Sequence, residues 1–404
     1  MNCLKFQRWK HLTSTQNKTT QNSSNHIMNR RLASRCYSTV SNYNSIVNHR
    51  SFIDFHKPLS PKNTFTVSSY NLLSRHYLWH QVYDYLPAKW TGWEQRFELI
   101  NRNMADLCDL SDIMCFQEME YLIYQSFWKD FMLSRNYDSI FQKKRKPAYW
   151  QKNINMMDGV SIFVNKKKFN IINYEQIDLA HFFASKHYFE QTPDLEKRLA
   201  SRNTVAVIAV LEHIPTKSTV FISNTHLYWS PNHPDVKLMQ TFLLTQLLKR
   251  AVQRQFRLSE EETEEMLKGG HNLNVFMVGD FNSAPDSPVY RFLTQGRVDL
   301  KQEKEISQFN YGSQLTSALS TPFDKFNSPY KALFEEDKFL KTTYTQKFKR
   351  IIDYIWFNKS SDQLELIKVL GDIESQYLEH YPGFPNPEFP SDHFPILAEF
   401  ELKS

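Results

Sequence analysis

The chain of 404 residues has only nine glycines and four cysteines, and it lacks any run of the roughly 20 apolar residues that a membrane-spanning helix requires. No glycine-rich phosphate loop is present, so phosphate chemistry would have to rest on a metal ion and side chains. The cysteines Cys3, Cys36, Cys108 and Cys115 show no C-x-x-C spacing. We therefore expect no membrane span, no disulfide framework and no zinc site.

Acidic residues are missing from the first part of the chain, where none precedes Asp54. Seven lysines and arginines lie before residue 38, in a segment crowded with serine, threonine and asparagine. This composition is typical of a mitochondrial transit peptide, which we predict over residues 1–37, with cleavage between Tyr37 and Ser38. A disordered basic tail is the alternative. The whole chain carries a net charge of +6, so the remainder would carry −1, which does not favour nonspecific nucleic-acid binding.

The rest of the chain divides into a short segment without periodicity and a long patterned one. Residues 38–63 contain two prolines and predict a linker, and residues 64–404 are expected to form the catalytic domain. Helical spacing predicts helices over 93–107 and 235–257, the second capped by Asp235. Strand-like runs recur at 65–70, 112–116, 160–164, 205–211, 220–223, 275–278, 351–357 and 396–400. We expect an α/β fold of two packed mixed sheets.

Polar residues follow six of these apolar runs, at the point where a strand would end. Any one such segment is most simply explained as a turn. Six such segments along one chain indicate that their polar residues lie together at one functional edge of the fold. The segments are Ser69-Tyr70-Asn71, Phe116-Gln117-Glu118, Asn224-Thr225-His226, Gly279-Asp280-Phe281-Asn282, Ile352-Asp353-Tyr354 and Ser391-Asp392-His393.

In this order the six segments resemble the exonuclease–endonuclease–phosphatase superfamily, and most closely its carbon-catabolite-repressor deadenylase, Angel and Nocturnin branch, including mitochondrial fungal-type RNA exonucleases. The resemblance covers about Phe65 to Phe400 and implies a DNase I-like four-layer sandwich of two mixed β-sheets flanked by helices. Further segments that carry it are Trp93-Glu94-Gln95-Arg96, 158–163, 224–231, 235–241 and 279–283.

The resemblance implies a metal centre. Glu118 is expected to be the principal Mg²⁺ ligand with Asn71 beside it, and Asp392 to bind or position a second ion. Mn²⁺ is an alternative metal. Hard oxygen donors of this kind suit Mg²⁺, which takes substrate phosphate as a further ligand.

The resemblance also implies the catalytic groups. His393, oriented by Asp353, is expected to act as the acid–base or phosphate-stabilising partner. Asp280 is expected to activate the attacking water, while Asn282 and His226 bind the scissile phosphate. A carboxylate behind an imidazole fixes its tautomer and favours its protonated form, which suits a developing phosphorane charge.

In the deadenylase branch a proline and a phenylalanine hold the terminal base, and Pro231 and Phe348 occupy those positions. The pattern departs nearby, because Thr343 replaces an asparagine associated with adenine recognition and Arg350 replaces a glycine. The resemblance therefore does not predict adenine selectivity.

The basic run Lys143-Lys144-Arg145-Lys146 falls where family members contact phosphate, and Arg145 is the expected contact. A solvated charge run is the alternative. Trp79, Trp90 and Trp229 could stack on RNA bases, although packing is the more common role of large aromatics.

These features predict a Mg²⁺-dependent RNA 3′-exonuclease that acts on single-stranded RNA and releases 5′-mononucleotides, in mitochondria. An RNA-end, cyclic or dinucleotide phosphatase, a DNA-repair endonuclease and an RNA-binding protein without turnover are alternatives. No leucine-rich repeat precedes the domain, so docking to a deadenylase complex is not implied.

Overall fold

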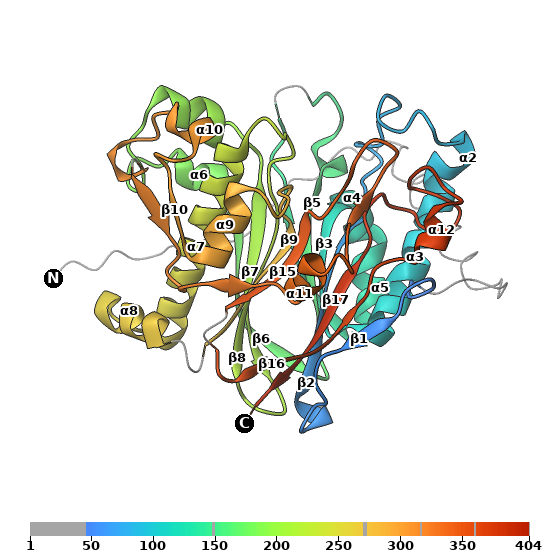
Figure 1. The fold of residues 1–404 in the computed structure, drawn as a ribbon, viewed down its shortest axis with the longest axis horizontal. Coiled ribbons are helices and arrows are strands. Elements are labelled where there is room, and N and C mark those ends of the chain that lie inside the picture. Colours follow the sequence, from blue (N-terminus) through green and yellow to red (C-terminus); the bar gives the residue numbers. More distant parts are fainter. Residues whose placement is uncertain (1–45, 148–149, 270–272, 316, 359–360, 404) are drawn as a thin grey trace, which may run out of the picture. The chain divides into compact units, whose positions relative to one another are not determined.

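The computed structural model describes residues 46–147, 150–269, 273–315, 317–358 and 361–403. The predicted transit peptide lies outside these residues. Two large sheets dominate the described part of the chain (Figure 1). The seven-stranded sheet has the order β1 (Phe52–Asp54), β16 (Leu364–Leu370), β17 (Ile396–Leu402), β2 (Thr64–Asn71), β3 (Ile113–Glu120), β5 (Asp158–Asn165), β4 (Tyr137–Lys143).

The second sheet has six strands and a similar plan. Its order is β12 (Phe326–Asn327), β15 (Asp353–Asn358), β9 (Asn274–Asp280), β8 (Thr219–His226), β7 (Val205–His213), β6 (Phe169–Asp178). In each sheet one central pair is parallel, β2 with β3 and β8 with β9, while the neighbouring pairs are antiparallel. Two small ribbons pair β10 (Arg297–Asp299) with β11 (Ala318–Ser320) and β13 (Thr343–Tyr344) with β14 (Lys349–Arg350).

The two sheets pack face to face over an apolar core. Phe65 of β2 and Phe400 of β17 meet Phe276 of β9, with ring centroids 5.9 Å and 5.1 Å from it. Strands β2, β3 and β9 are buried along their whole length. Their residues are apolar or internally hydrogen-bonded because both faces of each strand are covered.

Helices form the outer layers. Figure 1 shows α3 and α5 outside the seven-stranded sheet and α6, α7 and α9 outside the six-stranded sheet. This confirms the predicted mixed α/β arrangement of two sheets flanked by helices. The helices are α2 (Ala88–Thr91), α3 (Trp93–Leu110), α4 (Tyr121–Ile123), α5 (Lys129–Leu133), α6 (Leu179–Phe183), α7 (Pro234–Phe256), α8 (Glu260–Gly269), α9 (Pro288–Gln295), α10 (Lys304–Ser307), α11 (Lys331–Glu335) and α12 (Ser375–Leu378). Shorter 3-10 or π-helical turns lie at Pro61–Asn63, Tyr124–Trp128, Ile154–Met156, Leu195–Ala200 and Ser313–Leu315.

The linker prediction is wrong for residues 46–63, which belong to the domain. Strand β1 pairs with β16, and the buried guanidinium of Arg50 donates to the carbonyls of Gly371 at 2.7 Å and Pro395 at 2.6 Å. These partners lie more than 300 residues away along the chain, so local periodicity could not reveal them. The expected boundary at residue 64 therefore lies too late.

The prediction that Asp235 caps α7 is also wrong. The helix begins at Pro234, and the side chain of Asp235 is buried in an ion pair with Arg198 at 2.7 Å. A tertiary partner thus replaces the local capping bond. At the next helix, α8, a local cap does form, because the Glu262 N–H donates to the Ser259 hydroxyl at 3.2 Å.

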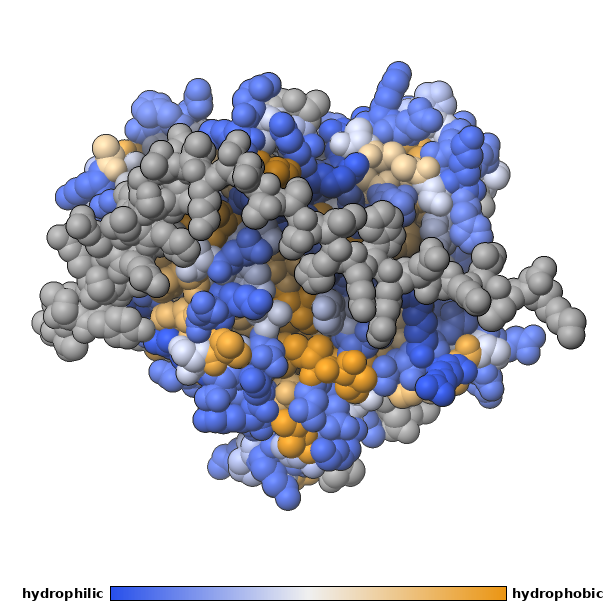
Figure 2. Space-filling view, turned by 180° about the vertical axis from the view of Figure 1, so that it is seen from behind, coloured by the Kyte–Doolittle hydropathy of each residue, from blue (hydrophilic) through white to orange (hydrophobic). Residues whose placement is uncertain are grey.

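Within the described ranges, no helix is both long and apolar enough to cross a bilayer. Figure 2 shows a face that is mainly hydrophilic where it is not covered by grey atoms, with hydrophobic residues gathered near its middle.

Candidate active site

The parallel strand pairs bring the predicted site residues to one edge of the molecule. Strands β2 and β3 run side by side toward Asn71 and Glu118, and β8 and β9 end together at the paired residues His226 and Asp280. Asp353 begins β15 opposite Asp280. Because the carboxyl ends of parallel strands share an edge, residues far apart in sequence converge there.

Glu118 is held at this edge by a local backbone distortion and two donors. Its φ of 57° lies in the left-handed region, where a register shift interrupts the pairing of β3 with β5. Its carboxylate accepts from the Ser74 N–H at 2.8 Å and from the Asn71 amide at 3.1 Å. Such strain at a non-glycine residue is often found at functional sites.

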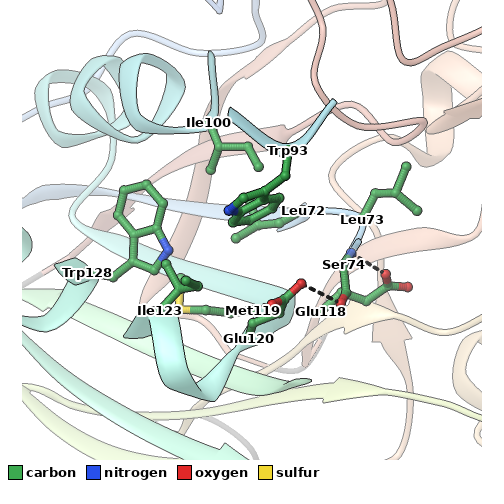
Figure 3. A pocket seen from close by; sticks show the side chains of 10 residues that line it. All are labelled: Leu72, Leu73, Ser74, Trp93, Ile100, Glu118, Met119, Glu120, Ile123 and Trp128. Carbon is green, nitrogen blue, oxygen red and sulfur yellow. Dashed lines mark hydrogen bonds between the residues drawn. The ribbon is translucent and has the colours of Figure 1, made fainter. Parts of the chain in front are cut away.

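An apolar wall lies behind this carboxylate. Figure 3 shows Glu118 and Glu120 hydrogen-bonded to Ser74 beside a small pocket. The other lining residues are Leu72, Leu73, Trp93, Ile100, Met119, Ile123 and Trp128. Burial raises the pKa of Glu118 to about 7, so the site holds a carboxylate that lacks full compensation for its negative charge.

Asn71 connects two carboxylates. Its amide nitrogen donates to Glu118 at 3.1 Å and to Asp280 at 3.0 Å, while its amide oxygen accepts from the Leu73 N–H. In this arrangement Asn71 holds the carboxylates together. To act as the predicted oxygen ligand, its amide would have to turn over and lose the bond from Leu73.

Asp353 and His393 form a hydrogen-bonded dyad. His393 Nδ1 lies 2.9 Å from Asp353 Oδ2, and its Nε2 lies 3.8 Å from Asp280 Oδ2. Burial by itself lowers the pKa of His393, but the charges of Asp353, Asp392 and Asp280 together hold that pKa well above its ordinary value. This direction of the shift favours the cationic imidazole in this site.

Thr342 supports this dyad from behind. Its hydroxyl donates to Asp353 Oδ2 at 2.6 Å and accepts from the Asp353 N–H at 3.1 Å. Sequence reasoning missed Thr342, because a threonine next to Thr343 carries no catalytic signal. Its neighbour Thr343 is buried and forms an isolated bridge with His393.

Asp280 is positioned by Gly279 and Asn282. Gly279 has a φ of 138°, and a Cβ there would lie 2.0 Å from the Thr225 carbonyl oxygen, so only glycine fits. The Asn282 N–H donates to Asp280 Oδ1 at 2.9 Å. Burial, together with the charge of Asp353, raises the pKa of Asp280 to about 7. Asp280 is thus poised to exchange a proton near neutral pH.

His226 contrasts with His393. Its Nε2 lies 3.5 Å from Asp280 and its Nδ1 3.9 Å from Glu118. Burial, with smaller contributions from the positive charges of Lys144 and His393, lowers the pKa of His226 well below its ordinary value. His226 is therefore neutral and His393 cationic. The neutral ring can donate a hydrogen bond, whereas the cationic ring can stabilise negative charge.

The chemistry of these donors fits a divalent cation. Glu118 and Asp280 are buried carboxylates with raised pKa values, and Asp392 has one buried carboxylate oxygen without a hydrogen-bond partner among the described residues. Its other oxygen accepts from the Tyr83 hydroxyl at 2.9 Å. Asp280, Asp353 and His393 also lie close enough to share an ion. The cationic His393 disfavours that arrangement, so Glu118 and Asp392 are the better candidate ligands.

The predicted substrate contacts have different outcomes. Pro231 is exposed, and Phe348 is 46% exposed in the turn between β13 and β14. Asn282 lies in the site, its amide donating to the Leu227 carbonyl at 3.0 Å.

Arg145 forms an ion pair with Asp178 at 2.5 Å and donates a hydrogen bond to the Arg202 carbonyl at 2.8 Å. Its neighbour Lys144 is buried against Asp158 at 2.6 Å, and its charge acts on Glu118 and His226. Sequence reasoning identified the basic run but selected Arg145 where Lys144 faces the site.

Comparisons with known proteins agree with this geometry. A model of the Endonuclease/Exonuclease/phosphatase family matches residues 68–393. The Ccr4 proteins of Saccharomyces cerevisiae and Kluyveromyces lactis, each described as the 3′-5′-exoribonuclease subunit of the CCR4-Not complex, are both 32% identical over 342 residues, or 84% of this chain. This chain spans only 39% and 41% of their lengths.

Two solved structures share the fold. ANGEL2, described as a 2′,3′-cyclic phosphatase, is 23% identical with a TM-score of 0.66, and the match covers 88% of this chain and 99% of that one. The human Nocturnin catalytic domain is 20% identical with a TM-score of 0.56, covering 89% and 100%. At these identities the likeness concerns the fold alone.

Proposed function

Because the chain belongs to the Endonuclease/Exonuclease/phosphatase family, whose members are hydrolases, we propose that it is a Mg²⁺-dependent 3′-exonuclease that shortens single-stranded RNA and releases 5′-mononucleotides. The observation that carries the proposal is the convergence of Glu118, Asp280 and the Asp353–His393 dyad at one strand edge. The described activity of the Ccr4 relatives supports the choice of RNA.

A divalent cation held by Glu118 and Asp392 would neutralise their charge and withdraw electron density from the phosphate oxygens. Asp280 accepts from the Asn282 N–H on Oδ1 and from the Asn71 amide on Oδ2. The remaining lone pair of Oδ2 would accept a proton from the attacking water. The raised pKa of Asp280 makes it a stronger base than an exposed aspartate.

The two histidines would serve the phosphate differently. The cationic His393 stabilises the negative charge that develops on the phosphorane, and Asp353 holds its ring in place. The neutral His226 donates one hydrogen bond without adding a second positive charge. Because His226 Nε2 points toward Asp280, these two side chains lie on the same side of the site.

A second candidate is a phosphatase that acts on RNA ends or on cyclic phosphates. Thr343, which is buried and bridged to His393, stands where the deadenylase branch is expected to have a base-recognising asparagine. The same catalytic groups could act on a shorter ligand. The fold likeness to ANGEL2 is compatible with this candidate but does not select it.

Product analysis separates the two candidates. The full chain would be incubated with Mg²⁺ and 5′-labelled single-stranded RNAs that end in a 3′-hydroxyl, a 3′-phosphate or a 2′,3′-cyclic phosphate, beside Glu118→Gln. Stepwise shortening that Glu118→Gln abolishes supports the exonuclease. Loss of the terminal phosphate without shortening would replace it with the phosphatase.

The proposed location is the mitochondrion, on the basis of the basic, acid-free N-terminal segment. Fusion of residues 1–37 to a fluorescent protein should direct that protein to mitochondria. Replacing Arg30, Arg31 and Arg35 with glutamine should abolish this targeting. A cytosolic wild-type fusion would overturn the proposal.

A further inference from the structure

Two exposed tryptophans contact each other in the loops that follow strands β2 and β8 of the candidate active site. Trp79 lies in the loop after β2 and Trp229 in the loop after β8, so each sheet contributes one. Their ring centroids are 6.2 Å apart at an interplanar angle of 79°. Trp79 is 46% exposed and Trp229 59% exposed. Exposed indoles in contact leave apolar ring faces open to a ligand.

The pair belongs to a continuous series of four rings, which we call the aromatic row: Tyr77, Trp79, Trp229 and Tyr228. Tyr77 lies 6.1 Å from Trp79, and Tyr228 lies 6.0 Å from Trp229. The row is therefore exposed in its middle and joined to the protein at both ends.

A cation lies over the ring at each end of the row. Lys144 lies 5.2 Å above Tyr77, and Arg202 lies 4.3 Å above Tyr228. Tyr77 also donates to Asp158 at 2.8 Å, and Arg202 donates to the Tyr228 hydroxyl at 3.2 Å. Both ends are thus held in place. Because Lys144 is buried in an ion pair with Asp158, Arg202 is the end that carries positive charge toward an anionic ligand.

The row lies on one flank of the catalytic edge. Asp158 begins β5 and Arg202 precedes β7, which are the strands next to β3 and β8 on one side of each sheet. Phe348 precedes β15, next to β9 on the other side. A polynucleotide whose terminal base sits by Phe348 would therefore cross the catalytic groups before it reaches the aromatic row.

We propose that Trp79 and Trp229 stack with bases of single-stranded RNA upstream of the scissile phosphate, a role that rests on the proposed function. Stacking on an aromatic face grips a strand without reading its sequence, because every base has such a face. The positive charge of Arg202 at one end of the row complements a flanking phosphate. The row thereby sets a preference for substrates several nucleotides long.

The test compares a single-stranded oligouridylate of about 12 nucleotides with the dinucleotide UpU, which is too short to reach both flanks. Trp79→Ala and Trp229→Ala in the full chain are expected to raise KM for the longer RNA about tenfold each. The value of kcat and the cleavage of UpU should change much less. Trp79→Phe and Trp229→Phe should restore most of the binding. Tyr174→Ala removes an aromatic ring that is 51% exposed on β6 and serves as the matched control.

Removing bases from the RNA identifies the stacking position. An abasic nucleotide placed at each upstream position in turn should weaken cleavage by the wild type at one or two positions. At those same positions the abasic nucleotide should reduce cleavage by Trp229→Ala only slightly. Equal losses in both proteins at every position would overturn the proposal.

A binding measurement keeps this result separate from the proposed function. Anisotropy of the labelled longer RNA in EDTA gives its Kd without turnover. If the wild type binds but does not shorten the RNA, the exonuclease is wrong, and a Kd raised by Trp79→Ala still supports the row. If the wild type shortens the RNA and both alanine variants match it in KM and Kd, the row plays no part in binding. No binding by the wild type would overturn both.

Discussion

Gln117 of β3 donates a hydrogen bond to the side-chain oxygen of Asn224 of β8 at 2.8 Å, and so joins the two sheets directly beneath the catalytic edge. Asn224 in turn donates to the carbonyls of Phe116 at 2.9 Å and Ser161 at 2.8 Å. All these groups are buried. The relative position of Glu118 and His226, each one or two residues further along its strand, therefore depends on this connection.

Asn224→Leu is expected to destabilise the fold by about 2–4 kcal/mol, because it removes the side-chain donor of two buried carbonyls and one acceptor of the Gln117 amide. Chemical denaturation gives the free energy of unfolding. Asn170→Leu is the matched control, since the side chain of Asn170 is exposed and donates to Glu212 at the surface. Its effect should stay within about 0.5 kcal/mol. Equal effects of the two substitutions would contradict a special role of the buried connection.

Gly279→Ala is expected to cost at least about 2 kcal/mol and to reduce activity strongly. The added Cβ would overlap the Thr225 carbonyl oxygen at 2.0 Å, and the φ of 138° is strained for alanine. Relief of this overlap moves the strand end that carries Asp280.

Gly92→Ala tests the reason given for Gly279. Gly92 has no atom nearer than 3.7 Å to an added Cβ. Its substitution should change the free energy of unfolding by less than about 1 kcal/mol. Thermal unfolding and activity measured on both variants decide the point, and a stable, active Gly279→Ala would show that the close contact does not matter.

The sequence predicted the elements that repeat local patterns and missed those that depend on distant partners. The strands that carry Asn71, Glu118, His226 and Asp280 could be predicted, because an apolar run followed by a polar residue is visible locally. The place of Asp235 could not be predicted, because its partner Arg198 is reached only in the folded chain.

The same limit applies around the site. The choice between Lys144 and Arg145 depends on which face of the chain turns toward Glu118, and the run of basic residues carries no alternation that reveals it. Thr342 was missed because a single hydroxyl close to a carboxylate gives no sequence pattern. The membership of residues 46–63 in the domain depends on pairing with a strand near the other end of the chain.

His213 is expected to make the fold sensitive to mild acid. Burial, with a smaller contribution from the charge of Lys168, lowers the pKa of His213 to about 4, beside Phe169 at 5.0 Å. Protonation is therefore easier in the unfolded chain, where the pKa is near 6.5. The contribution of His213 to stability should be constant above about pH 6.5 and should fall as the pH decreases from there toward about 4.

Denaturation curves across this range check the sign. His213→Gln should flatten the fall in stability between about pH 6.5 and 4. His181→Gln, which removes an exposed imidazole, should leave the curve of the wild type unchanged. An identical slope in all three proteins would assign the acid sensitivity to other groups.

Divalent metal is expected to stabilise the folded protein independently of catalysis. Glu118 and Asp280 share the Asn71 amide, and burial raises the pKa of each to about 7, so their negative charges are poorly compensated. A cation that binds the folded state alone adds stability that grows with the logarithm of its concentration. Millimolar Mg²⁺ should therefore raise Tm relative to EDTA.

Glu118→Gln should remove this response. Because one buried negative charge is lost, its Tm in EDTA should be equal to or above that of the wild type. Glu98→Gln, at a partly exposed pair with Arg102, is the control that should keep the full Mg²⁺ response. If Mg²⁺ raised Tm equally in wild type and Glu118→Gln, the stabilising ion would bind elsewhere, and Glu118 would lose its proposed role as principal ligand.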